Sequence, residues 1–158
     1  MSAVNWLSGA EIEHYIAHNA DESTKNVYLG IFSVDTLPLK VCNYPLLLIV
    51  NSDTSNLPGK HWRAVYIADN LHGEIFDPLG VPISLQLECW MNSFTVKWIR
   101  TYNFIQHPLS PSCGAFVLHF VLNRMQEKSL DTYVRNNYDN ALSVNESVIK
   151  SFVKRLRK

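Results

Sequence analysis

The chain has 158 residues, of which 47% are hydrophobic and 18% are charged, and its 14 lysines and arginines balance its 14 aspartates and glutamates. A chain of this size and composition can bury most of the surface that its unfolded form exposes, so we expect one domain over residues 1–158, monomeric by default. Zero net charge does not favour nucleic acid as the main partner. No apolar run approaches the ~20 residues that a membrane span needs, so we expect no membrane partner.

The N-terminal half is predicted to begin with a helix and to continue into strands. Residues 1–6 lack the basic region and apolar core of a secretory signal, so we expect a protein that is not secreted. Ser8 and Glu11 can form a capping box, which predicts a helix over residues 9–18. Residues 28–32 fit either a short strand or a helix-like turn. The remaining predicted elements of this half are a buried strand over 46–50, a loop over 51–60 and a hairpin of strands 62–68 and 73–77.

The C-terminal half is predicted to be mainly helical. The predicted elements are a helix over 84–93, a strand within 95–105 that is broken near Arg100, a helix over 113–127, an irregular polar segment over 131–140 and a last amphipathic helix. Ser143 and Glu146 can cap that last helix, whose apolar face repeats through Ile149, Phe152, Val153 and Leu156. This order of elements predicts an α+β fold with a mainly antiparallel sheet packed on the helix that begins at Cys113.

Four residues in chain order supply the parts of a thiol protease. Cys113 offers a nucleophile, and His61 offers the imidazole that can convert a thiol into a thiolate. Asp77 can accept a hydrogen bond from the second ring nitrogen and fix the tautomer. The amide of Gln106 can donate to the oxyanion that forms during acyl transfer. Each residue alone has a structural explanation, such as a packed histidine or an Asp-Pro turn, but their joint order and spacing favour the protease.

The surroundings of Cys113 strengthen this interpretation. Residues 108–112 are unlike a helix, and a nearly continuous apolar run follows the cysteine, so we expect Cys113 in the first turn of a buried helix. The helix dipole and the unpaired N–H groups of a first turn stabilise a thiolate. Gly114 leaves room for a substrate backbone, and Trp62 can form a wall of the cleft that favours small substrate residues such as glycine.

The motifs His61-Trp62, Phe76-Asp77-Pro78-Leu79-Gly80, Gln106 and Cys113-Gly114 resemble, in this order, the adenain family of adenovirus-type maturation proteases. That family lies within the wider clan that includes the SUMO-deconjugating proteases. The resemblance covers roughly residues 27 to 126. It departs from the adenovirus enzymes at Asp77, where they usually carry glutamate, and in lacking the cysteine through which they tether an activating peptide.

The resemblance implies a papain-like arrangement in permuted order, with the histidine before the cysteine. It implies a cysteine endopeptidase with a His61-Asp77-Cys113 triad and a Gln106 oxyanion hole, which matures viral structural precursors at Gly-containing sites. It also implies residence in the nucleus or cytoplasm of a host cell and in the virion. The chemistry requires no metal or other cofactor, although family members are activated by a peptide and by DNA.

Two other functions stay open at this point. The first is a deconjugase that removes a ubiquitin-like modifier at a Gly-Gly terminus, which would need a surface of several hundred Å² for the folded modifier. The second is a non-catalytic peptide-binding module on a protease fold.

The remaining polar and cysteine residues are given structural explanations. Cys42 and Cys89 are predicted to be buried small hydrophobic residues, with a disulfide tether for a peptide activator at Cys89 as the alternative. A basic group near the C-terminus is predicted to be the solvated face of the last helix, with nucleic-acid contact as the alternative. This group consists of Lys150, Lys154, Arg155, Arg157 and Lys158.

Overall fold

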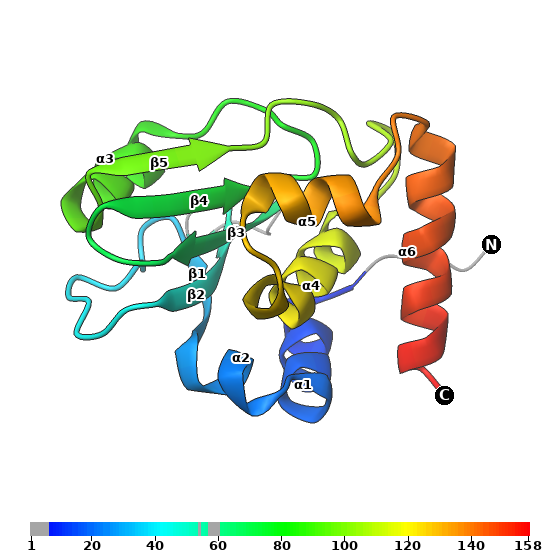
Figure 1. The fold of residues 1–158 in the computed structure, drawn as a ribbon, viewed down its shortest axis with the longest axis horizontal. Coiled ribbons are helices and arrows are strands. Elements are labelled where there is room, and N and C mark those ends of the chain that lie inside the picture. The colour runs from blue at the N-terminus through cyan, green and yellow to red at the C-terminus, as the bar shows by residue number, and fades with distance from the viewer. Residues whose placement is uncertain (1–6, 54, 57–60) are drawn as a thin grey trace.

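The computed structural model describes residues 7–53, 55–56 and 61–158, so the predicted loop over 51–60 lies partly outside the described residues. Figure 1 shows the elements along the chain. In order they are α1 (Gly9–Asn19), α2 (Glu22–Val27), β1 (Tyr28–Ser33), β2 (Leu46–Asn51), β3 (Trp62–Ile67), β4 (His72–Phe76), α3 (Leu85–Phe94), β5 (Lys97–Arg100), α4 (Cys113–Asn123), the short 3₁₀ helix η1 (Arg124–Gln126), α5 (Leu130–Asn137) and α6 (Leu142–Leu156).

The five strands form one mixed sheet in the order β1-β2-β3-β4-β5. The central pairs β2–β3 and β3–β4 are antiparallel, whereas the outer pairs β1–β2 and β4–β5 are parallel. The prediction of a mainly antiparallel sheet is therefore wrong for its two edges. A parallel pair needs a long crossover rather than a tight turn. Residues 34–45 supply it between β1 and β2, and α3 supplies it between β4 and β5.

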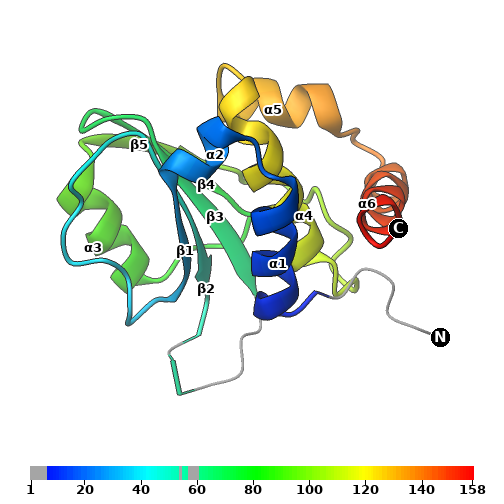
Figure 2. The ribbon, with the colours of Figure 1, turned by 90° about the horizontal axis from the view of Figure 1, so that it is seen from below.

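Both faces of the sheet are covered, and the two faces have separate apolar clusters. Leu47 and Ile49 of β2 point into the cluster formed with α1, α4, α5 and α6. Leu46, Leu48 and Val50 point into the other cluster, which includes α3. Figure 2 shows α3 on one side of the sheet and α1 and α4 on the other. Because a strand buried on both faces needs apolar residues at every position, the unbroken run of β2 predicted its burial correctly.

Helix α4 is the most buried helix of the fold. Every residue from Cys113 to Val121 is buried, against α1, β3 and α6. The stacked rings of Phe76 and Phe120, 4.9 Å apart, fix α4 against the end of β4. The helix ends at Asn123 and continues as η1, so the prediction of a helix over 113–127 holds for its first 11 residues. Cys113 is its first residue.

Two helices occupy segments where none was expected. The predicted irregular segment 131–140 is wrong, because α5 spans most of it. Ser129 caps α5 by accepting a hydrogen bond from the Thr132 N–H, and Leu130 and Tyr133 are buried on its inner side. The second unexpected helix is α2, which ends directly before β1. Residues 28–33 form strand β1, so the strand is the correct alternative for this segment.

The two predicted capping boxes have opposite outcomes. At α1 both bonds form: the Glu11 N–H donates to the Ser8 hydroxyl and the Ser8 N–H donates to the Glu11 carboxylate. At α6 the prediction is wrong, because the helix begins at Leu142 and its first residue follows Ala141, which has no capping side chain. Glu146 instead accepts hydrogen bonds from a different part of the chain.

The cysteines outside α4 are exposed, so the prediction that Cys42 and Cys89 are buried is wrong. Cys42 lies in the crossover after β1, and Cys89 lies on the outer side of α3. The basic residues of the C-terminal segment are exposed, as expected for a solvated helix face. None of the helices among the described residues combines the length and the apolar character needed to cross a membrane.

Candidate active site

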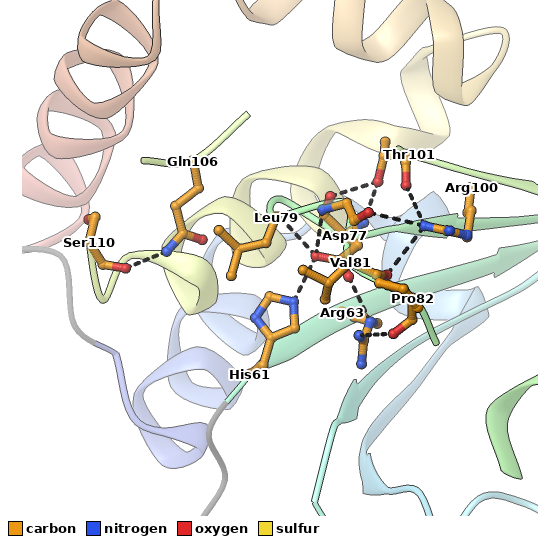
Figure 3. Close-up of polar contacts among 11 residues, drawn as sticks. His61, Arg63, Asp77, Leu79, Val81, Pro82, Arg100, Thr101, Gln106 and Ser110 are labelled. Carbon is orange, nitrogen blue, oxygen red and sulfur yellow. Dashed lines mark hydrogen bonds and ion pairs between the residues drawn. The ribbon is translucent and has the colours of Figure 1, made fainter. Parts of the chain in front are cut away.

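Asp77, directly after β4, is the centre of a buried polar network (Figure 3). Its Oδ1 lies 2.7 Å from His61 Nε2, and its Oδ2 accepts a 2.8 Å hydrogen bond from Arg63 Nε. Burial on its own raises the pKa of Asp77. The hydrogen bond and charge of His61 and the charge of Arg63 outweigh burial and hold that pKa below its usual value. Asp77 is therefore ionised at neutral pH, although no part of it is exposed.

The backbone around Asp77 is fixed by the turn that follows it. Oδ1 of Asp77 also accepts from the N–H groups of Leu79, at 2.8 Å, and Gly80, at 3.2 Å. The Asp77 N–H donates to the Thr101 hydroxyl oxygen, and that hydroxyl donates to the Asp77 carbonyl at 2.6 Å. The carboxylate that contacts His61 thus also closes the Asp-Pro turn, so the role of Asp77 in the turn is compatible with a role beside His61.

His61, the residue before β3, lies between Asp77 and Cys113. Burial of the ring on its own lowers the pKa of His61. The hydrogen bonds and charges of Asp77 and Cys113 outweigh that effect and raise the pKa to about 9. Because Nε2 faces Asp77, Nδ1 is the ring nitrogen left for the thiol. The arrangement places an imidazole whose pKa is raised beside the thiol of Cys113, and such a neighbour is the usual means of activating a thiol.

Cys113 is buried at the first position of α4. The positive end of the helix dipole favours an anion at this position. Sheet and helix thus bring together His61 from the start of β3, Asp77 from the end of β4 and Cys113 from the start of α4.

Gln106 lies in the irregular segment between β5 and α4 and is buried. Its backbone N–H donates to the Pro78 carbonyl at 2.9 Å, which ties it to the turn after Asp77. Its side-chain Nε2 donates to the carbonyl of Ser110, while Oε1 is buried with no hydrogen-bond partner. The second N–H of this amide is the one left for an oxyanion. Figure 3 shows Gln106 and Ser110 to one side of the Asp77 network.

Gly114 and Trp62 pack against each other. A Cβ on Gly114 would lie 3.2 Å from Ile12 Cδ1 and 3.3 Å from both the Leu7 carbonyl oxygen and Trp62 Cδ1. The missing side chain therefore lets α1 and the indole approach α4, and this close packing accounts for the glycine. Trp62 is half-buried and also lines a shallow groove of about 170 Å³ together with Asn51 and Asp53.

Sequence reasoning missed two residues of the site, Arg63 and Thr101. Arg63 carries a signal that could have revealed it: it is a charge inside an apolar strand, two positions after His61, and alternate residues of an extended chain point to the same side. Thr101 has no such signal, because its role depends on the pairing of β4 with β5.

Across residues 7–53, 55–56 and 61–158, no group of three or more histidine, cysteine or acidic residues could hold a metal ion.

Comparison with known proteins identifies similar folds. No protein-family model and no curated protein sequence matches this chain. The fold is similar to that of the ASFV pS273R protease, with a TM-score of 0.55 and 21% identity. The similarity covers 74% of this chain but only 45% of the length of that protease. It is also similar to the central domain of the uncharacterized Lpg1148 protein from Legionella pneumophila, with a TM-score of 0.51 and 16% identity, over 96% of this chain and 99% of that domain. The chain thus has a mixed α+β fold similar to that of a protease.

Proposed function

We propose that this chain is a cysteine protease with Cys113 as nucleophile, His61 as its proton acceptor and donor, and Asp77 as the residue that orients His61. The observation that carries the proposal is the position of His61 between a buried, ionised carboxylate and the thiol at the start of α4. The similarity of the fold to a protease supports it.

The proposed reaction has two stages. The Cys113 thiolate attacks the peptide carbonyl carbon, and the imidazolium of His61 gives its proton to the leaving amine, which leaves an acyl-enzyme. Water then attacks the acyl carbon with His61 as base and releases the carboxylate product. Asp77 keeps one ring orientation and favours the imidazolium in both stages. These steps use only protein groups and water, so we propose no cofactor for the chemistry.

Gln106 and the Cys113 backbone N–H are proposed to stabilise the tetrahedral oxyanion. Donors fixed toward a developing negative charge are worth about 10²–10³ in rate for each donor. The burial of Gln106 and its backbone bond to Pro78 O support this role, because they restrict where the amide can lie.

As the substrate, we propose viral structural precursors cleaved at Gly-containing sites, as in the adenain family. The motif order, and the permuted papain-like arrangement that it implies, carry this proposal. Trp62, which lines the groove at the start of β3, would favour small substrate residues there. Residence in a host cell and in the virion belongs to the same proposal, as does activation by a peptide or by DNA.

A second candidate is a deconjugase for a ubiquitin-like modifier. The segment around Gln106 exposes Tyr102 by 70%, Phe104 by 52% and Leu109 by 89%. A folded modifier could cover such apolar side chains next to the cleft, whereas a short peptide would not need them.

Hydrolysis assays separate these functions. We expect a fluorogenic peptide with a Gly-Gly cleavage site to be hydrolysed by the wild-type chain, not by Cys113→Ala, and about 10²–10³ more slowly by Gln106→Ala. Faster release of a fluorophore from the C-terminus of a folded ubiquitin-like modifier would favour the deconjugase. Equal hydrolysis by wild type and Cys113→Ala would overturn both, and a chain that binds peptides without cleaving them would be a binding module.

A further inference from the structure

The segment that carries Gln106 has no regular secondary structure of its own. This Gln106 loop, residues 105–112, is the second part of the connection between β5 and Cys113. An oxyanion donor must lie within a few tenths of an ångström of its working position. Contacts from outside the loop must therefore define its geometry.

Glu146 in α6 supplies the most concentrated set of such contacts. Its Oε1 accepts from the His107 N–H at 2.8 Å and from the Ser112 hydroxyl at 3.1 Å. Its Oε2 lies 3.0 Å from the Ser110 hydroxyl and 2.9 Å from the Ser112 hydroxyl. Hydrogen bonds to a carboxylate are about twice as strong as neutral ones. One side chain thus holds the loop at three residues.

The neighbouring Asn145 fixes α6 to the start of the Gln106 loop and to the segment that precedes α6. It is fully buried, and its Nδ2 donates to the Ile105 carbonyl at 3.0 Å and to the Asp139 carbonyl at 2.8 Å. Its Oδ1 accepts from the Asp139 N–H at 2.7 Å. The first turn of α6 is therefore held at a defined position, so Glu146 is itself a fixed support.

The residues that Glu146 contacts adjoin both parts of the proposed oxyanion hole. The Ser110 carbonyl accepts the hydrogen bond of the Gln106 amide, so the position of Ser110 determines where that amide points. Ser112 is the residue before Cys113, whose backbone N–H is the second proposed donor. Among the described residues, the Glu146 carboxylate accepts hydrogen bonds from His107, Ser110 and Ser112, and not from His61 or Asp77.

We propose that Glu146 is the positioning residue of the oxyanion hole, acting through the Gln106 loop. This inference rests on the proposed cysteine protease function and deepens it. It predicts that loss of Glu146 slows reactions that pass through an oxyanion and spares the reactivity of the thiolate.

Two small probes separate these effects without substrate recognition. With p-nitrophenyl acetate, the thiolate attacks the ester carbonyl, an oxyanion forms, and p-nitrophenolate leaves as the thioester forms. With iodoacetamide, the thiolate forms its S–C bond as iodide leaves, and no oxyanion forms. The exposed Cys42 and Cys89 would also react, so the parent protein for every variant is Cys42→Ser/Cys89→Ser.

The variants are Glu146→Ala, Glu146→Gln, and Glu88→Ala as the matched control. Glu88 is an exposed glutamate on α3, on the other side of the sheet. We expect Glu146→Ala to slow acylation of Cys113 by about 10-fold or more, with alkylation changed less than about twofold. Glu146→Gln keeps an acceptor oxygen and should lie between Glu146→Ala and the parent, and Glu88→Ala should match the parent.

Two results would overturn the inference while leaving the protease intact. One is acylation by Glu146→Ala at the parent rate. The other is a parallel fall of acylation and alkylation, in Glu146→Gln as well as Glu146→Ala, which would indicate a general loosening of the site. A parent protein whose acylation does not depend on Cys113, tested with Cys113→Ala, would instead refute the proposed function, and the role of Glu146 with it.

Discussion

The hydrogen bonds of single residues determine which protonation states the site can adopt. Asp77 lies in a buried position that would ordinarily favour its neutral form, yet it accepts hydrogen bonds from His61, Arg63 and two backbone amides. An ionised Asp77 in turn keeps the neighbouring imidazole positively charged. The acid–base behaviour of the site therefore depends on a pair of residues that are 16 positions apart in the sequence.

The first prediction concerns the alkaline limit of activity. The pKa of His61 is raised to about 9, so the imidazolium that donates a proton in the proposed mechanism persists to about that pH. We expect kcat/KM for a peptide amide to fall as the pH rises through about 9. The raised pKa of His61 also stabilises the folded protein at low pH. This stabilisation is complete below the ordinary histidine pKa of about 6.5, and it is lost as the pH rises through the folded-state pKa of about 9.

Asp77→Asn tests the cause of this shift. The amide lacks the charge that favours the imidazolium, so the alkaline limb should move toward the ordinary histidine value of about 6.5. A profile of kcat/KM against pH measures the shift. An alkaline limb at the same pH in both proteins would show that Asp77 does not set the protonation of His61.

Sequence reasoning identified these residues because each has a recognisable chemical type in a recognisable order. His61, Asp77 and Cys113 lie together in the structure as their order suggested. The second partner of Asp77, Arg63, was not anticipated, and nothing local to Gln106 indicated that its amide would donate to Ser110. Such contacts depend on the path of a loop, which residue types alone do not specify.

At the level of elements, burial decided what the sequence could predict. Strands β2 and β3 lie at the centre of the sheet, and their apolar runs identified them. Helix α5 is mostly polar, with a Ser129 cap and two buried side chains. Its anchor is tertiary: Glu74 of β4 accepts from the Leu130 N–H and pairs with Arg124 through two hydrogen bonds. A partner 56 residues away cannot be read from local periodicity.

The parallel edges of the sheet were missed for a related reason. A short turn between two apolar runs indicates a hairpin, and the β3–β4 connection was predicted from such a turn. The direction of β1 and β5 depends instead on crossovers whose return path is a property of the whole fold.

The second prediction concerns the turn after β4, which accepts backbone hydrogen bonds from the Gln106 loop. Gly80 has a φ of +60°, and a Cβ there would lie 2.5 Å from the carbonyl carbon of Tyr102, which is backbone and cannot rotate away. We expect Gly80→Ala to destabilise the protein by more than ~1 kcal/mol and to lower turnover, because Asp77 and Gln106 are held by this turn.

Chemical denaturation and peptide hydrolysis measure both effects. Gly9→Ala is the control, since a Cβ at Gly9 makes only ordinary contacts of 3.5 Å or longer and alanine suits a helix. If Gly80→Ala were as stable and as active as Gly9→Ala, the turn would not have the tight geometry described here.

At the scale of the whole molecule, the site lies where the sheet meets one buried helix. Helices α1, α4 and α5 lie on one face of the sheet, and α6 packs on α4 on the side away from the sheet, as Figures 1 and 2 show. Helix α4 packs against β3 and against the end of β4. This packing brings together His61 and Cys113, which come from distant parts of the chain. The prediction of one domain over residues 1–158, acting as a monomer, stays a prediction.

The fold and the proposed activity of this chain rest on different kinds of evidence. Similar folds at 21% and 16% identity establish the architecture, whereas the activity has to be argued from the geometry of the site. Arginine and threonine side chains hold Asp77 in place, and a glutamate side chain holds the Gln106 loop.

The most direct test is the intact mass of the protein after exposure to a Gly-Gly-terminated peptide electrophile. The parent protein is again Cys42→Ser/Cys89→Ser, because the exposed thiols of Cys42 and Cys89 lie outside the site and could also react. Cys113→Ala and His61→Ala are compared in this parent, and we predict one adduct on the parent, none on Cys113→Ala and much slower labelling of His61→Ala. An adduct that persists in Cys113→Ala, or labelling of His61→Ala at the parent rate, would contradict the claim that His61 activates Cys113.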